Sequence, residues 1–331
     1  MTKSSILVTG GAGYIGSHVV RQLGEQFEDV IILDNLTTGF ESAVLHGKLV
    51  RGDTGNMQLV SELIKEHNID SVLHFAAHTI VPESVDNPLK YYGNNTCHSR
   101  NLLQCCLEGG VKNFIFSSTA AVYGIPTTST VDENSPNQPI NPYGTSKLMT
   151  EWMLKDLGQA SNLNYVILRY FNVAGADPKG RIGQSTKQAT LLTKVACEAA
   201  IGKRPSVAIF GTDYPTPDGT GVRDYIHVED LASAHISALK YLRNGGESTI
   251  LNCGYGHGYS VREVLDMVGK IHGTPLNIIE QPRRAGDPPQ LIADNTKIKA
   301  TLDWTPQFDD LKKIVQHALT WEKNLLTLNY Q

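Results

Sequence analysis

The most constraining feature of the sequence is a glycine-rich segment, VTGGAGYIGSH, at residues 8–18. It follows a short apolar run and leads into an amphipathic run, which indicates a turn between a strand and a helix. Its glycines fit both a GxGxxG and a GxxGxxG spacing, which permits a tight turn and lets a pyrophosphate approach the helix N-terminus. Close packing of the strand on the helix is an alternative use of such a turn. The residues expected to contact a dinucleotide are Gly10, Gly13, Tyr14, Ile15 and Gly16.

Short β-branched runs alternate with longer amphipathic segments through the first half of the chain. This order of strands and helices predicts a parallel, doubly wound sheet of the Rossmann type. The expected strands cover 5–9, 29–33, 71–75, 113–118 and 164–171, and the expected helices cover 14–26, 57–68, 88–109 and 143–160.

The pattern changes after about residue 172, where glycine- and proline-rich stretches separate shorter elements. We therefore predict an α/β protein with a Rossmann-like dinucleotide-binding domain over 1–172, which carries the catalytic residues. A smaller α/β substrate-binding domain is expected over 173–331, and interleaving of strands across the boundary is left open. Helices in this second part are expected near 187–201, 229–243, 260–272 and 308–325.

Composition narrows the expected partners and location. The 331 residues carry a net charge of -4, which argues against the basic surface that nucleic-acid binding needs. Five scattered cysteines without a CxxC pair suit free thiols in a reducing compartment, and the histidines form no metal-binding pattern. The sequence lacks a signal-peptide pattern and any apolar run of membrane-spanning length. We expect a cytoplasmic protein with no metal, nucleic acid or membrane partner.

Two carboxylates bear on the choice of dinucleotide. Asp34 ends the second strand, where a carboxylate can accept hydrogen bonds from the adenosine ribose and would repel a 2′-phosphate. Residues 34–47 contain no Arg or Lys, so NAD is favoured over NADP. The plainer alternative for Asp34 is that it caps a turn. Asp53, which follows a third strand, is a weaker candidate for an adenine contact.

The segment NPYGTSK, residues 141–147, suggests a proton-transfer pair. Its helix is expected to begin after Pro142, so Tyr143 and Lys147 lie on the same face, about one turn apart. A neighbouring ammonium would lower the pKa of the Tyr143 phenol and let it accept a proton from a substrate hydroxyl. Lys147 is also expected to reach the nicotinamide ribose. Thr119, at the carboxyl end of the fifth strand, is expected to relay the proton between substrate and phenol.

Each of these residues has an ordinary explanation when taken alone. A YxxxK spacing is common on exposed helices, and Ser or Thr often ends a strand. Their order behind a dinucleotide turn makes the catalytic interpretation the better one. The predicted catalytic residues are Thr119, Tyr143 and Lys147.

With these motifs in place, the chain resembles the extended short-chain dehydrogenase/reductase family over nearly its whole length, and within it the branch that epimerises UDP-sugars. The stretch from residue 208 to residue 231 is the most diagnostic. The markers are VTGGAGYIGSH, LDNL, HFAA, PESVDNPLKYY, NFIFSSTAAVYG, PYGTSK, LRYFNVAGA, AIFGTDYPTPDGTGVRDYIHVEDL and PRRAGDPP.

The resemblance implies that UDP-galactose and UDP-glucose are interconverted through a 4-keto intermediate. A tightly bound NAD that is not consumed would take hydride from C4′ while Tyr143 takes the 4′-hydroxyl proton. The keto sugar would then turn about its pyrophosphate link and receive the hydride on its other face. The protein is therefore expected to hold UDP firmly and the sugar loosely.

The resemblance also carries over individual residues. It implies that backbone groups of Ala208 and Phe210 hold uracil, Arg223 and Arg284 the pyrophosphate, Asp287 the ribose, and Asn172 the phosphate or sugar. Arginine suits this task because its fork donates to two phosphate oxygens at once. Further NAD neighbours implied in the same way are Asn35, Phe75, Ala76, Asn95 and Tyr170.

Three positions depart from the relatives' pattern. Thr79 stands where well-known bacterial relatives have a lysine near the cofactor phosphates, so NAD is expected to be held less tightly. Leu191 replaces an Asn or His that often contacts the nucleotide, and that role is not carried over. Leu291 stands where relatives restricted to plain hexoses have a tyrosine, which leaves room for a 2′-N-acetyl group. UDP-GlcNAc and UDP-GalNAc are therefore candidate substrates, unless neighbouring side chains fill the space.

Other functions remain open on the sequence. A UDP-pentose 4-epimerase would use the same mechanism, and a catalytically silent NAD sensor would share the fold. A sugar-nucleotide 4,6-dehydratase fits less well, because Ala120 and Ala121 stand where an Asp–Glu acid/base pair would be needed. Helices 88–109 and 143–160 are expected to pair across a two-fold axis in a homodimer, although their apolar faces have an alternative use against the sheet.

Overall fold

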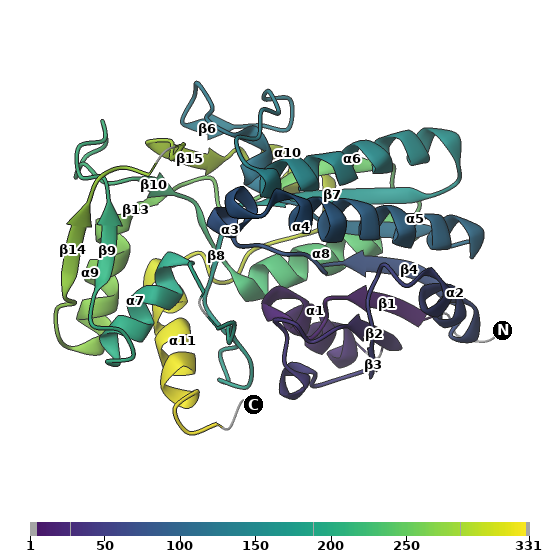
Figure 1. The fold of residues 1–331 in the computed structure, drawn as a ribbon, viewed down its shortest axis with the longest axis horizontal. Coiled ribbons are helices and arrows are strands. Elements are labelled where there is room, and N and C mark those ends of the chain that lie inside the picture. Colours follow the sequence, from purple (N-terminus) through teal and green to yellow (C-terminus); the bar gives the residue numbers. More distant parts are fainter. Residues whose placement is uncertain (1–4, 27, 188, 285, 329–331) are drawn as a thin grey trace.

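The larger part of the molecule is built around a seven-stranded parallel sheet (Figure 1). The structure is a computed structural model, which describes residues 5–26, 28–187, 189–284 and 286–328. The strand order is β12-β7-β5-β4-β1-β2-β3, and every neighbouring pair is parallel. Its strands are β1 (Ser5–Thr9), β2 (Val30–Asp34), β3 (Lys48–Arg51), β4 (Ile69–His74), β5 (Asn113–Ser117), β7 (Asn164–Tyr170) and β12 (Thr249–Cys253). The predicted doubly wound Rossmann-like sheet is confirmed.

Helices cover both faces of this sheet, which explains why its central strands are apolar almost throughout. One face carries α1 (Tyr14–Glu25) and α8 (Val228–Arg243), whose buried side chains join those of β1, β2 and β7 in one core. The other face carries α2 (Met57–Glu66), α5 (His98–Glu108) and α6 (Pro142–Ala160), which share a second core with the opposite side chains of the same strands.

The segment before α5 is less regular than the sequence indicated. One continuous helix was expected over 88–109, but the chain forms α4 (Pro88–Tyr91), a π-helix (Tyr92–Cys97) and then α5. A short helix, α3 (Val81–Asp86), precedes them. A π-helical insertion of this kind often lies next to a functional site, and here it borders the cavity described below.

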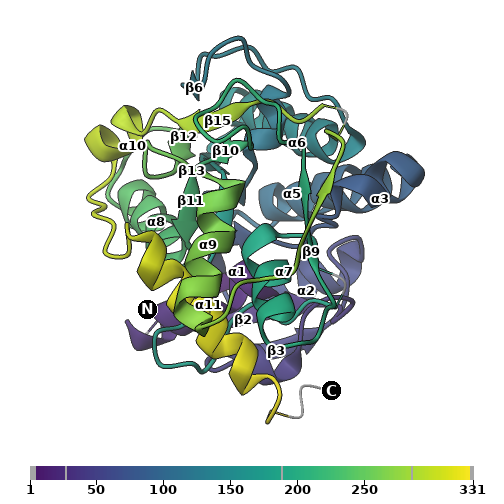
Figure 2. The ribbon, with the colours of Figure 1, turned by 90° about the vertical axis from the view of Figure 1, so that its left-hand side faces the viewer.

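The smaller part of the molecule consists of short strands and four helices of the described residues (Figure 2). Its sheets have the orders β13-β10-β15-β6, β11-β8 and β14-β9. The strands are β6 (Thr130–Val131), β8 (Asn172–Ala174), β9 (Val207–Phe210), β10 (Val222–Arg223), β11 (Tyr225–His227), β13 (Tyr259–Ser260), β14 (Ile278–Gln281) and β15 (Gln290–Ala293). The helices are α7 (Leu192–Ala200), α9 (Val261–His272), α10 (Thr296–Thr301) and α11 (Leu311–Asn324).

The two parts exchange strands. β12 lies late in the chain but pairs with β7 in the large sheet, whereas β6 comes early and pairs with β15 in the smaller sheet. The division at residue 172 therefore remains a prediction rather than a clean boundary. The helix expected over 187–201 begins only at Leu192, and the one expected over 308–325 begins at Leu311.

Across the described ranges, the helices are all too short or too polar to cross a lipid bilayer.

Candidate active site

A cavity of about 670 Å³ opens at the carboxyl ends of β1, β2, β4 and β5. This is the edge where open parallel sheets bind ligands. Most of the predicted site residues line it: Gly10, Gly13, Tyr14, Ile15, Gly16, Asp34, Asn35, Asp53, Phe75, Ala76, Thr119, Tyr143, Tyr170, Asn172, Arg223, Asp287 and Leu291. The cavity thus brings together residues that lie up to about 280 positions apart in the sequence.

Five predicted residues do not line this cavity: Asn95, Lys147, Ala208, Phe210 and Arg284. Asn95 is buried and its amide is used within the protein: it accepts from His78 N at 2.8 Å and donates to the His78 carbonyl at 3.0 Å. Asn95 therefore holds a cavity-lining loop in place, and direct contact with NAD stays a prediction.

The glycine turn is shaped for a dinucleotide. Gly10 has φ +72°, and a Cβ there would lie 2.5 Å from the backbone nitrogen of Ala76. A Cβ at Gly16 would overlap the Gly10 carbonyl oxygen and lie 2.9 Å from Gly11 Cα. At Gly13 the only atom within 4 Å of a Cβ would be the Gly10 oxygen, at 3.2 Å, among the residues described. Two glycines are thus needed for packing, and the third leaves space toward the cavity, which fits a bound pyrophosphate.

Asp34 combines the two roles considered for it. Its carboxylate accepts hydrogen bonds from Ala12 N at 2.9 Å and from Leu36 N at 2.8 Å, and Leu36 has φ 58°. These contacts fix the glycine turn against the end of β2. Asp34 also lines the cavity, and burial raises its pKa despite the two backbone donors. The ribose contact predicted for it is compatible with this position.

Asn35 and Asp53 form a second polar pair at the same end of the cavity. Asn35 Nδ2 donates to Asp53 Oδ2 at 3.0 Å, and Asp53 Oδ1 accepts from Gly55 N at 2.7 Å. The pair connects the ends of β2 and β3. The predicted adenine contact of Asp53 remains a prediction.

The start of α6 places the predicted catalytic phenol. Asn141 caps the helix by accepting from Gly144 N at 2.9 Å, and Pro142 occupies the first turn, where its missing N–H has no consequence. Tyr143 follows directly and is only 7% exposed, and Thr119 is 8% exposed. Burial raises the pKa of Tyr143, while a hydrogen bond with Thr119 opposes the rise. Tyr143 and Thr119 are therefore hydrogen-bonded, and the proton relay through Thr119 stays a prediction.

Lys147 lies one turn further along α6 and is 3% exposed. Its Nζ donates to the Ser117 carbonyl at 2.9 Å and lies 4.9 Å from the centre of the Phe116 ring. Burial lowers the pKa of Lys147 to about 7, and the charge of Glu151 opposes this shift.

These contacts correct one expectation. We predicted that Lys147 would lower the pKa of Tyr143, but the pKa of the phenol is raised. The physical reason is that the phenol is buried and loses hydration, while the Lys147 ammonium donates to the Ser117 carbonyl. Among the protein's own groups, desolvation therefore favours the neutral phenol.

A fully buried ion pair fixes α6 to the sheet. Glu151 on α6 and Arg169 on β7 are both 0% exposed, and Arg169 Nη2 lies 2.6 Å from Glu151 Oε2. Ser118 donates to the same carboxylate at 2.5 Å, and Arg169 Nη1 donates to the Tyr123 hydroxyl at 3.0 Å. This network connects the turn that carries Thr119 to the helix that carries Tyr143.

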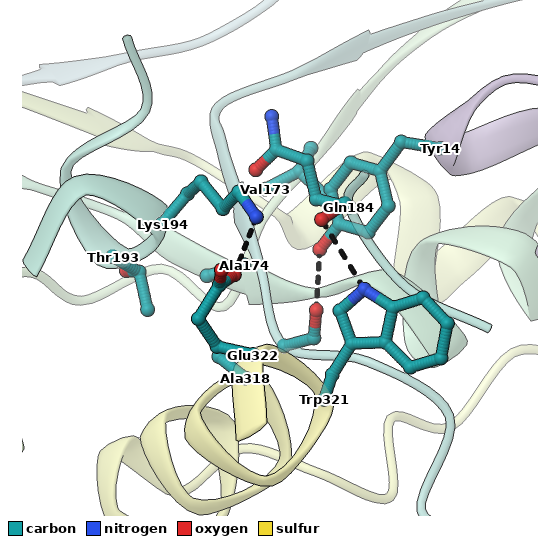
Figure 3. Close-up of a pocket in the computed structure, with 10 residues that line it drawn as sticks. Tyr14, Val173, Ala174, Gln184, Thr193, Lys194, Ala318, Trp321 and Glu322 are labelled. Carbon is teal, nitrogen blue, oxygen red and sulfur yellow. Dashed lines mark hydrogen bonds and ion pairs between the residues drawn. The ribbon is translucent and has the colours of Figure 1, made fainter. Parts of the chain in front are cut away.

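Tyr14, in the glycine turn, contacts the smaller part of the molecule (Figure 3). Its hydroxyl donates to the Gly175 carbonyl at 2.7 Å, beside a small space of about 10 Å³. The buried ion pair of Lys194 and Glu322 lines the same space, which joins α7 to α11. Desolvation raises the pKa of Tyr14, so it remains a neutral hydrogen-bond donor. The cofactor turn is thus attached to a backbone carbonyl 161 residues away in the sequence.

The residues predicted to hold the nucleotide are more exposed. Arg223 Nη2 lies 3.9 Å from Asp287 Oδ1, a loose pair, and both line the cavity. Arg284 lies with its guanidinium carbon 3.7 Å from the centre of the Phe210 ring. Leu291 lines the cavity and packs beside Phe171 in a small apolar cluster.

Sequence reasoning missed some polar residues that line the cavity. Gln184, Thr186 and Lys187 come from the loop before α7, and Lys90 and Asn94 come from the irregular segment before α5. Loop composition gave no signal for the first group. In the second group, Lys90 lies within the PESVDNPLKYY marker and Asn94 follows it by two residues, so their nearness to the cofactor edge could have been inferred from that marker.

The histidines form no metal centre among the residues that the structure describes. His74, for example, is buried between Thr9 Oγ1 at 2.6 Å and Ser99 Oγ at 2.7 Å, and burial lowers its pKa to about 3. It is a neutral packing residue behind the cavity.

A glycine turn after β1, an acidic residue after β2, and a buried Tyr–Lys pair after β5 at one edge of a parallel sheet define a nicotinamide-dependent Rossmann enzyme. A sequence model of the NAD dependent epimerase/dehydratase family matches residues 6–254. The chain belongs to this family.

Individual relatives agree with this assignment. The chain is 53% identical to the UDP-glucose 4-epimerase of Azospirillum brasilense, over 97% of this chain and 92% of that protein. The crystal structure of UDP-glucose 4-epimerase from Brucella ovis in complex with NAD is 41% identical, with a TM-score of 0.93, covering 96% of this chain and 97% of that one. The UDP-Glc/GlcNAc 4-epimerase of Campylobacter jejuni is 49% identical, with a TM-score of 0.86, covering 97% and 99%.

Proposed function

We infer that this chain interconverts UDP-galactose and UDP-glucose by inverting C4′, with NAD as a bound cofactor that is regenerated in each turnover. Full-length similarity to UDP-glucose 4-epimerases supports this function. The observation that carries it is the placement of Tyr143 and Thr119 in the same cavity as the glycine turn and Asp34. Neither the UDP-pentose alternative nor a catalytically silent NAD sensor is favoured by these relatives.

The residues around the glycine turn fit NAD. Gly10, Gly13 and Gly16 would admit its pyrophosphate, Asp34 its adenosine ribose, and Lys147 its nicotinamide ribose. Oxidised nicotinamide accepts a hydride and carries a positive charge, which favours ionisation of a nearby phenol. Asn35, Asp53, Phe75, Ala76, Asn95 and Tyr170 are proposed as its further neighbours.

Tyr143 is the proposed acid and base. Its phenolate accepts the 4′-hydroxyl proton when the alcohol is oxidised, and the phenol returns that proton when the keto group is reduced. Thr119 is hydrogen-bonded to Tyr143 and would pass the proton between substrate and phenol. Tyr143 and Thr119 are 7% and 8% exposed, so few solvent contacts compete with the hydrogen bond between them.

The nucleotide is proposed to be held at the outer end of the cavity. Arg223 and Arg284 would bind the diphosphate, Asp287 the ribose, Asn172 the phosphate or sugar, and backbone groups of Ala208 and Phe210 the uracil. The sugar would meet mostly small or apolar side chains, such as Ala120 and Leu291, which also line the cavity. Firm contacts to UDP and weak contacts to the sugar would let the keto sugar rotate about its pyrophosphate link without dissociating from the site.

We also propose that N-acetylated hexoses are substrates, because Leu291 is smaller than a tyrosine at the sugar end of the cavity. Similarity to the C. jejuni UDP-Glc/GlcNAc 4-epimerase supports this proposal. Leu291→Tyr should reduce kcat/KM for UDP-GlcNAc by about tenfold or more, because the larger side chain would occupy the space for the N-acetyl group. Turnover of UDP-galactose should stay largely intact. Failure of the wild type to turn over either N-acetylated sugar, while UDP-galactose reacts well, would refute it.

A homodimer is the proposed assembly, and the cytoplasm the proposed location. Val85, Leu89 and Trp152 lie on α3, α4 and α6 and are 61%, 79% and 50% exposed, an unusual share of apolar surface. Pairing of helices 88–109 and 143–160 across a two-fold axis would cover Leu89 and Trp152, which lie on them. Light scattering on purified protein should give twice the chain mass, and Leu89→Glu should shift it toward the monomer. Five free cysteines support the reducing location.

The function is tested by incubating purified wild-type protein with UDP-galactose. UDP-glucose should form, and absorbance at the wavelength of reduced nicotinamide should show no net production of NADH. Absence of conversion in protein shown to contain NAD would refute the epimerase and favour the sensor.

A further inference from the structure

Two consecutive arginines lie at the outer end of the proposed nucleotide site, and each is stacked on an aromatic ring. The guanidinium carbon of Arg283 lies 4.3 Å from the centre of the Tyr214 ring. That of Arg284 lies 3.7 Å from the centre of the Phe210 ring. Phe210 is the last residue of β9 and Tyr214 lies in the turn after it, so both rings that the arginines contact come from the end of one strand.

The two arginines differ in what else they contact. Arg283 donates to Asp213 Oδ1 at 2.7 Å and also to the Asp213 carbonyl, so its fork is occupied. The guanidinium of Arg284 has no ion pair or hydrogen bond to any residue that the structure describes. Its charge is therefore free for an anion, whereas that of Arg283 is used within the protein.

The backbone explains why the two arginines reach these rings. β14 runs parallel to β9 with Gln281 opposite Phe210, and Gly211 N donates to the Gln281 carbonyl at 2.8 Å. Gly211 has φ +85°, and a Cβ there would lie 2.7 Å from Arg283 Cγ. A glycine is therefore required where the chain after β14 crosses the end of β9.

We propose that Phe210 is a positioning residue that acts through Arg284, holding its guanidinium ready for the diphosphate of the substrate. This inference rests on the proposed function and deepens it by giving the Phe210 side chain a task besides the uracil contact of its backbone. Stacking on the ring face leaves the N–H donors at the guanidinium edge free. It also restricts a long, exposed side chain before the ligand arrives, so less conformational entropy is lost on binding.

Arg283 has a different task under this proposal. Its contacts to Tyr214 and Asp213 fasten the segment after β14 to the turn after β9, which fixes where Arg284 leaves the backbone. Arg283 is therefore a structural clamp, and only Arg284 meets the phosphate. The alternative is that Phe210 stacks directly on uracil, in which case its effect would not depend on Arg284.

A double-mutant cycle separates these two roles. The dissociation constants of UDP and uridine are measured by calorimetry for wild type, Phe210→Leu, Arg284→Gln and the double variant. We expect Arg284→Gln to weaken UDP by about tenfold or more, as for loss of a charge-assisted contact. Phe210→Leu should weaken UDP by about two- to fivefold, the usual range for an exposed cation–π contact, and leave uridine unchanged.

The double variant should bind UDP no more weakly than Arg284→Gln alone, because the ring then has no arginine to position. Phe210→Tyr keeps the ring face and should retain wild-type UDP affinity, which serves as the matched control. Thermal unfolding of each variant checks that the fold is intact. Additive losses in the cycle, or equal weakening of uridine and UDP by Phe210→Leu, would overturn the proposal. Failure of the wild type to bind UDP would instead contradict the proposed function.

Discussion

The proposed proton-transfer site and the proposed nucleotide site are built in opposite ways. Tyr143 and Lys147 lie on a long helix against a seven-stranded sheet and are almost fully buried. Arg223, Arg284 and Asp287 lie on short strands or loops; Arg284 and Asp287 are exposed, and the Arg223 side chain is 15% exposed. Burial strengthens electrostatic effects and shifts pKa values, whereas exposed charges are screened by water and salt.

This difference suits a reaction in which one end of the substrate must turn over while the other stays bound. Proton and hydride transfer need fixed positions to within fractions of an ångström, which a buried helix provides. Holding a diphosphate needs only charge and a few donors, which exposed arginine forks provide. Three changes test this contrast, and the first two are each compared with a matched position elsewhere.

The largest effect on stability is expected from breaking the buried ion pair between Glu151 on α6 and Arg169 on β7. Glu151→Gln leaves Arg169 charged and without its partner in the core, so the free energy of unfolding should fall by about 3–5 kcal/mol. Urea denaturation of the variant and the wild type measures this. The matched change in the nucleotide site is Asp213→Asn, which removes the exposed partner of Arg283 and should leave the unfolding midpoint within error. Equal losses in the two variants would contradict the contrast.

The next effect concerns the glycine turn. A methyl group at Gly16 would overlap the Gly10 carbonyl, so Gly16→Ala must displace the turn. Overpacking of this kind usually costs about 1–3 kcal/mol, and NAD affinity should fall by about tenfold or more. Gly93→Ala is the control, because a Cβ at Gly93 meets no described atom within 4 Å. Fluorescence titration with NAD measures the affinity of both variants. Unchanged NAD affinity in Gly16→Ala would show that the turn does not hold the pyrophosphate.

The smallest effect is the pH dependence of stability that Lys147 imposes. Burial lowers its pKa from 10.5 to about 7, so between these values the unfolded chain binds more protons than the folded one. Stability linked to this group therefore rises with pH across that window, and its cost is fully present below the folded pKa. Relative to Lys147→Met, the wild type should gain on the order of 1 kcal/mol between about pH 7.5 and 8.5. A difference that stays constant or falls with pH would mean that Lys147 is not desolvated.

The same contrast explains how much of the fold and of the candidate site could be predicted from the sequence. The glycine turn, Asp34 and the Tyr143–Lys147 spacing are local patterns within single strand–turn–helix units, and Tyr143 and Asp34 line the same cavity. Arg223 lies on β10, Leu291 lies on β15 and Asp287 lies in the loop before β15, and only resemblance brought them together. The return of β12 to the large sheet had no local signal, because strand pairing depends on contacts across more than 80 residues.

The raised pKa of Tyr143 could not be anticipated from spacing either. Sequence fixes that a lysine lies one turn away, but burial of both groups decides the sign of the shift, and burial follows from packing. The π-helical segment before α5 is a similar case, since the sequence pattern predicted one continuous helix over 88–109.

The central claim is that the Tyr143 phenol carries the proton of the reacting hydroxyl. The most direct test compares the rate of UDP-galactose conversion by wild type and Tyr143→Phe, with bound NAD quantified in both preparations. We expect active wild type and a variant slower by at least about a hundredfold with its NAD retained. A Tyr143→Phe protein that keeps its NAD and converts UDP-galactose at the wild-type rate would contradict the account.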